Sequence, residues 1–96
     1  MSTLVLTSSL QRPLRPLVEA ALNNELRLIE AGIRRTEQRL KDFEMRYGLS
    51  TQEFIQRYEN DEFVEMLDFD EWIGEYRLLE RLQEKAETLR GIRFAN

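Results

Sequence analysis

The chain contains no cysteine and no histidine among its 96 residues. It therefore lacks the usual ligands of zinc and copper, a thiol nucleophile, and the side chain that most often acts as a general base near neutral pH. No disulfide framework can form either. These absences argue against an enzyme, and we predict no catalytic residue, no metal site and no cofactor.

Glycine and proline are scarce, with four and two residues respectively, which leaves little material for the many turns of an all-β fold. No apolar run approaches the roughly 18 residues that span a bilayer. The first sixteen residues lack the basic start and the apolar stretch of a signal peptide. We therefore expect one soluble, cytoplasmic, all-α domain with no membrane contact.

Charged residues make up 33% of the chain, and they are unevenly distributed behind a net charge of −4. Residues 58–76 contain eight acids and neither lysine nor arginine, whereas the segments on either side each carry a small positive excess. The negative total argues against a dedicated nucleic-acid binder, which normally presents a basic face. The acidic segment instead indicates a basic partner.

A regular apolar pattern dominates the first half of the chain. Its positions are spaced alternately by four and three residues, and only a threonine interrupts the apolar series: Leu22, Leu26, Ile29, Ile33, Thr36, Leu40, Phe43 and Tyr47. This is a heptad seam of the coiled-coil type. It predicts a helix over residues 17–47, which Gly48 ends.

Such a helix would be roughly 46 Å long, whereas a compact chain of this size has a radius of gyration of only about 12–13 Å. One end of the helix must project, and its apolar seam stays exposed unless another chain covers it. We therefore predict a homodimer, with Leu22, Leu26, Ile29 and Ile33 as dimerisation residues. The alternative is that the other helices of the same chain cover the seam.

The remaining chain predicts two further helices. Ser50 and Glu53 form a capping box that starts a short helix over residues 51–59. After a loop, Asp68 and Glu71 suggest a second capped start, with Leu67 stapled onto the tryptophan five residues later, and the helix continues to residue 90. We expect the long N-terminal helix to pack antiparallel on this C-terminal helix, with the short helix between them.

The first sixteen residues are predicted to form a flexible or strand-like arm, and residues 17–96 to form the single helical domain. Arg12 and Arg15 lie in this arm, which itself contains no acidic residue. In a dimer they would present four charges to a phosphate backbone, enough for weak, salt-sensitive binding of operator DNA. The arm therefore supports a second hypothesis, a DNA-binding regulator.

Three interpretations compete for the acidic segment. A calcium loop starting at Asp68 fails, because Trp72 and Ile73 occupy positions that need an oxygen ligand and a glycine. A paired-carboxylate catalytic site would need a pocket, which we do not expect so small a helical hairpin to enclose. The third interpretation is a docking surface, in which large apolar side chains supply affinity and carboxylates speed encounter with a basic protein.

The docking interpretation assigns eight partner-binding residues: Glu59, Asp61, Glu62, Phe63, Glu65, Met66, Asp68 and Phe69. Trp72 and Tyr76 are four residues apart on one helix face and are better explained as core. For Phe63, Met66 and Phe69, core and docking remain equal alternatives.

Two motifs resemble short bacterial and archaeal antitoxins of the TumA-like type. They are FEMRYGLSTQEFIQRYE at residues 43–59 and DFDEWIGEY at residues 68–76, followed by a heptad-like helix. The matching positions are Tyr47, Gly48, Ser50, Glu53, Phe54, Asp68, Phe69, Glu71, Trp72 and Tyr76. Leu49 stands where methionine is usual, and residues 60–62 replace a glycine-containing acidic step.

The resemblance covers about half of the chain and implies a cognate toxin protein as partner. A toxin that acts on RNA or nucleotides would have a basic groove, which an acidic aromatic segment can occupy as a phosphate mimic. We therefore expect an antitoxin-like protein that binds a small basic toxin encoded nearby. The alternatives are a DNA-binding regulator of its own operon and a dimeric coiled-coil scaffold.

Overall fold

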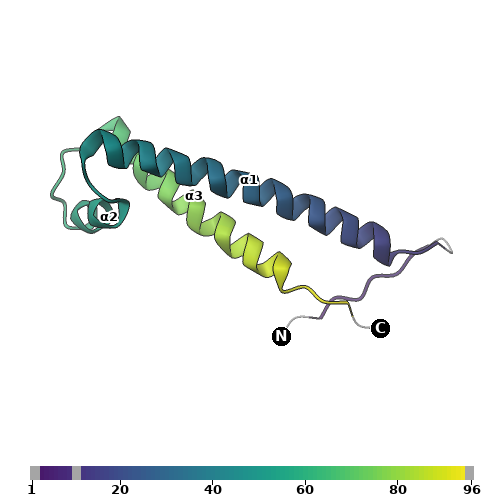
Figure 1. The fold of residues 1–96 in the computed structure, drawn as a ribbon. Coiled ribbons are helices and arrows are strands. Elements are labelled where there is room, and N and C mark those ends of the chain that lie inside the picture. The colour runs from purple at the N-terminus through teal and green to yellow at the C-terminus, as the bar shows by residue number, and fades with distance from the viewer. Residues whose placement is uncertain (1–2, 10–11, 95–96) are drawn as a thin grey trace.

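The computed structural model describes residues 3–9 and 12–94, and within these residues it contains three helices and no strand. They are α1 (Arg15–Tyr47), α2 (Thr51–Glu59) and α3 (Leu67–Arg90). Helix α3 runs back along α1, and α2 lies at the closed end of this hairpin (Figure 1). The predicted all-α architecture is confirmed, whereas the arm residues 3–9 form no strand.

Local capping explains where the first two helices end and begin. Gly48 ends α1 at a positive φ of 62°, and the next amide donates back to the Glu44 carbonyl at 3.2 Å. Ser50 then accepts a hydrogen bond from the Glu53 amide at the start of α2. Both features follow from the residues that the sequence places there.

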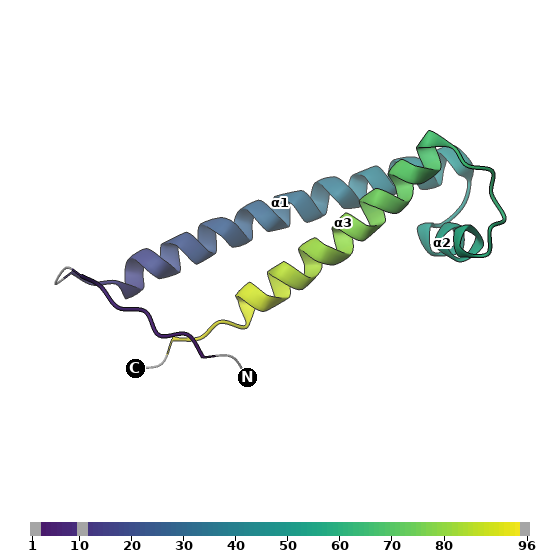
Figure 2. The ribbon, with the colours of Figure 1, turned by 180° about the vertical axis from the view of Figure 1, so that it is seen from behind.

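The chain is elongated, with extents of 61 × 25 × 18 Å and a radius of gyration of 19.1 Å. The predicted projection of α1 is therefore present. Facing residues along the hairpin keep one register: Gly32 lies against Leu82, Arg39 against Glu75 and Arg46 against Asp68. The last residue of α3, Arg90, is therefore level with about residue 24 of α1, so about nine residues at the start of α1 extend beyond α3, by about 14 Å. Figure 2 shows both chain ends at this open end of the hairpin.

Helix α3 covers much of the α1 seam within one chain. Ile29 is buried, and Leu22, Leu26 and Ile33 are half-buried. Thr36, the polar interruption, is buried with its hydroxyl donating to the Gly32 carbonyl at 2.8 Å. Most of the predicted seam is thus an intramolecular contact, and a dimer through these four dimerisation residues remains a prediction.

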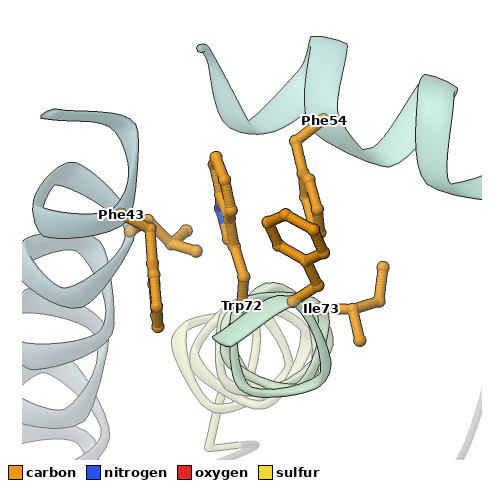
Figure 3. Packing of buried hydrophobic residues seen from close by; sticks show 6 residues of the cluster. Phe43, Phe54, Trp72 and Ile73 are labelled. Carbon is orange, nitrogen blue, oxygen red and sulfur yellow. The ribbon is translucent and has the colours of Figure 1, made fainter. Parts of the chain in front are cut away.

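The core lies at the closed end and is mainly aromatic. Trp72 of α3 is fully buried between Phe54 of α2 and Phe43 of α1 (Figure 3). Its ring stacks on Phe54 at a centroid separation of 3.9 Å and on Phe43 at 5.5 Å. The indole N–H donates to the hydroxyl of buried Thr51 at 3.0 Å. One side chain therefore joins all three helices.

The predicted capped start of α3 is wrong. Met66 is the N-cap residue, no side chain caps the helix, and Asp68 lies inside the first turn. Leu67 is 73% exposed, so it does not staple onto the buried Trp72. The Asp68 carboxylate is instead bound by side chains of α1, and these tertiary contacts replace the local cap.

Among the described residues, no helix is both long and apolar enough to cross a membrane.

Candidate protein-docking site

The loop between α2 and α3 is anchored by Phe63. The ring of Phe63 packs on Phe54 and Phe69, with centroid separations of 5.5 and 5.0 Å. Because Phe63 points into the aromatic cluster, the residues on either side of it are exposed. The loop is thus attached to the core through one side chain.

The turn that leads into this loop has a strained residue. Asp61 adopts a φ of 54°, in the left-handed region that non-glycine residues seldom occupy. Its amide donates to the Tyr58 carbonyl, and the Glu62 amide donates to the Arg57 carbonyl, both at 3.1 Å. This pair of bonds is a Schellman motif, which turns the chain sharply after α2.

Asp68 connects the loop end to α1. Its carboxylate accepts hydrogen bonds from the Tyr47 hydroxyl and from Arg46, the latter at 2.9 Å. The Tyr47 hydrogen bond and then Arg46 lower the pKa of Asp68 below its ordinary value. The same hydrogen bond raises the pKa of Tyr47. The start of α3 is therefore held at a defined distance from the end of α1.

The eight acids of the segment divide into two groups. Asp68 pairs with Arg46, and Glu71 and Glu75 lie 3.7 and 3.5 Å from Arg39. The other five acids are exposed, and across the described chain none of them forms an ion pair: Glu59, Asp61, Glu62, Glu65 and Asp70. We call residues 59–70 the acidic tip.

Apolar side chains lie exposed among these carboxylates. Val64 is 82% exposed, Leu67 73% and Met66 44%. An isolated exposed apolar residue needs no explanation. Here three exposed apolar residues fall within four positions, at the end of the loop and the first residue of α3, with unpaired acids before, between and after them in the sequence. Exposed apolar side chains among charged ones are typical of a recognition surface.

The eight predicted partner-binding residues differ in whether the structure leaves them exposed. Five of them are exposed on the acidic tip: Glu59, Asp61, Glu62, Glu65 and Met66. In contrast, Phe69 is 9% exposed within the core cluster, and Phe63 is half-buried against that cluster. Asp68 is occupied by its α1 partners. The prediction from sequence omitted Val64 and Leu67, which are also exposed.

A hollow borders the acidic tip, between the end of α1 and the loop that follows α2. This shallow hollow is lined by core rings and by Glu53 and Arg57, which pair with each other at 2.8 Å. No three acidic side chains in the described ranges lie close enough together to hold a metal ion. What the surface provides is carboxylate charge and exposed apolar contact.

The predicted DNA-contacting arginines lie at the opposite end of the molecule from the tip. Arg15 pairs with Glu19 at 2.8 Å, and its guanidinium lies 5.0 Å from the Phe94 ring centre. Arg12 is exposed. Contacts with its own chain therefore already engage one of the two arginines.

Comparison with protein families, with curated proteins and with solved structures finds no match to this chain in any of the three.

Proposed function

We propose that the protein is an antitoxin-like binding module that docks through its acidic tip onto a basic surface of a small toxin encoded nearby. The observation that carries the proposal is the set of five unpaired carboxylates around exposed Val64, Met66 and Leu67.

The tip is arranged as a binding surface would require. Like charges in one short segment repel each other, and a basic partner relieves this repulsion while the carboxylates accelerate encounter. The apolar side chains then supply contact area that is lost from water on binding. Phe63 and Asp68 pre-order the loop, which reduces the entropy lost when the partner binds.

The residues that resemble the antitoxin motifs lie beside the acidic tip, and this resemblance supports the antitoxin-like function. The motif positions Phe54, Asp68, Phe69 and Trp72 all support the tip, as core rings or as the Asp68 anchor. They position the docking surface, while the side chains that contact the toxin come from the loop and its rims.

The test is co-expression with the product of the adjacent gene, followed by affinity measurement. In a tip variant, Asp61→Asn, Glu62→Gln and Glu65→Gln are combined. The matched control replaces three exposed acids of α3 outside the tip, Glu80, Glu84 and Glu87, with glutamine. We expect the tip variant to bind at least about tenfold more weakly at low salt, a loss of about 1.4 kcal/mol.

The outcomes separate the competing functions. Loss of binding in the tip variant but not in the control supports docking through the tip. Equal weakening of both variants indicates non-specific attraction to negative charge and contradicts it. Salt-sensitive retention on duplex DNA that is lost on replacing Arg12 and Arg15 with alanine would favour the operon regulator, and dimerisation with no toxin binding would favour the scaffold.

A further inference from the structure

The N-terminal half of α1 has an uncharged face on the side away from α3. Its exposed positions recur at helical spacing and carry no charge, in a chain of which one third is charged: Leu17, Ala20, Ala21, Asn24, Leu28 and Ala31. Leu17 is 68% exposed and Leu28 is 63% exposed. We call these six residues the outer stripe.

The outer stripe is distinct from the predicted dimer seam. At 100° per residue, Leu26 and Ile29 lie between about 100° and 180° around the helix from Leu17 and Leu28, on the side that faces α3. Helix α3 therefore leaves the outer stripe uncovered. Another surface has to cover it if its leucines are to leave water.

We propose that a second copy of the chain packs antiparallel along the outer stripe. With a two-fold axis between residues 22 and 23, Leu17 of each copy lies opposite Leu28 of the other, and Ala21 lies opposite Asn24. The same pairs recur on both sides of the axis, as an isologous interface requires. The alanines between the leucines allow the two helices to approach closely.

Flanking charges support this orientation. In the antiparallel pairing, Arg27 lies beside Ala20 of the second copy, and Glu25 lies beside Val18, so no like charges meet. A parallel pairing would bring Arg35, the next position of the stripe pattern, against Arg35 of the second copy. Like charges in direct opposition are destabilising.

The negative charge of the acidic tips also favours a dimer that forms through the N-terminal half of α1, because this arrangement keeps the two tips far apart. The tip follows the end of α1 at Tyr47, about 37 Å from the proposed axis. The antiparallel arrangement places the two tips roughly 70 Å or more apart, far beyond the screening length of about 8–10 Å. Contact through the tips themselves would instead oppose ten unpaired carboxylates.

The test is sedimentation equilibrium of the full chain, wild type and single variants. We expect a wild-type dimer, and Leu17→Glu and Leu28→Arg should each raise the dimer dissociation constant by at least about 100-fold, because each places two unpaired charges in the interface. Met45→Glu, at an 83% exposed α1 residue outside the outer stripe, is the matched control and should leave the constant unchanged.

Mixing the two charge variants tests the orientation. An antiparallel heterodimer sets the introduced glutamate of one copy opposite the introduced arginine of the other and keeps one Leu17–Leu28 pair, so the mixture should dimerise at least about tenfold more tightly than either variant alone. Circular dichroism should show unchanged helix content, since both positions are exposed. A monomeric wild type, no recovery on mixing, or a dimer disrupted only by Leu26→Glu would each overturn the proposal.

Discussion

The hydrogen bond between Trp72 and Thr51 provides the sharpest test of how the closed end is held together. The indole nitrogen belongs to a fully buried side chain, and the hydroxyl oxygen of Thr51 lies 3.0 Å from it on a residue that is 5% exposed. Replacing Thr51 with valine keeps the shape but leaves the indole N–H without its acceptor. We expect a loss of about 1–3 kcal/mol in the free energy of unfolding.

A loss of this size is large for the molecule. Domains of this kind have total stabilities of about 5–15 kcal/mol, and each kcal/mol lowers the melting temperature by about 4–8 °C. Thr51→Ser keeps the hydroxyl and is the matched control, with an expected loss below about 1 kcal/mol. In both variants the residue 51 amide keeps its bond to the Glu44 carboxylate at 2.7 Å.

A double-mutant cycle separates the hydrogen bond from packing. Trp72→Phe removes the N–H donor, so Thr51→Val in that background leaves no unsatisfied group and should cost about 1–2 kcal/mol less than in the wild type. Urea unfolding followed by circular dichroism suits all four proteins, because Trp72→Phe removes the only tryptophan. An equal cost of Thr51→Val in both backgrounds would refute the reasoning.

Two further predictions concern the loop and its attachment. Asp61→Gly should raise the free energy of unfolding by about 0.5–1 kcal/mol in urea denaturation. Relief of the left-handed strain, about 1–2 kcal/mol, outweighs the greater freedom of glycine in the unfolded chain, about 0.4–1 kcal/mol. Asp61→Asn removes the same charge and should leave stability nearly unchanged, so a stabilisation shared by both variants would contradict the role of backbone strain. Asp68 has a lowered pKa when folded, so its stabilising contribution is present above its ordinary value of 3.8 and is lost as pH falls through the folded value. Tyr47 has a raised pKa, so its contribution is present below its ordinary value of 10.0 and is lost as pH rises through the folded value. Asp68→Asn should reduce the acid-side decline in thermal unfolding experiments between about pH 2 and 7; a decline identical to that of the wild type would contradict the assignment.

Local features of the sequence were sufficient to predict the helical framework. The end of α1 at Gly48 and the start of α2 after Ser50 depend on backbone conformation and capping within a few residues. The antiparallel packing of α1 and α3 follows from two long amphipathic helices in a short chain. These predictions needed no information on distant contacts.

The details of the acidic tip depend on contacts between residues far apart in the sequence. Asp68 resembles a helix cap locally, yet Arg46 and Tyr47, more than twenty residues away, compete successfully for its carboxylate. Phe63 points inward and Val64 outward because the aromatic cluster offers a place for one ring. A short loop has no periodicity from which this choice could be predicted.

The predicted dimer seam illustrates a different limit. The heptad pattern identified the apolar face of α1 correctly, but an apolar face is the same whether it packs on its own chain or on another. Helix α3 occupies the part around Ile29. The weaker pattern of leucines and alanines on the outer stripe became visible only when the extent of α3 was known.

The most direct test of the central claim is a calorimetric titration of the adjacent gene product with the wild-type chain and with the variant that combines Asp61→Asn, Glu62→Gln and Glu65→Gln. Docking through the acidic tip predicts wild-type binding that weakens as salt rises, and at least about tenfold weaker binding with a smaller salt dependence for the variant. Equal affinity and equal salt dependence for the two proteins would contradict the claim.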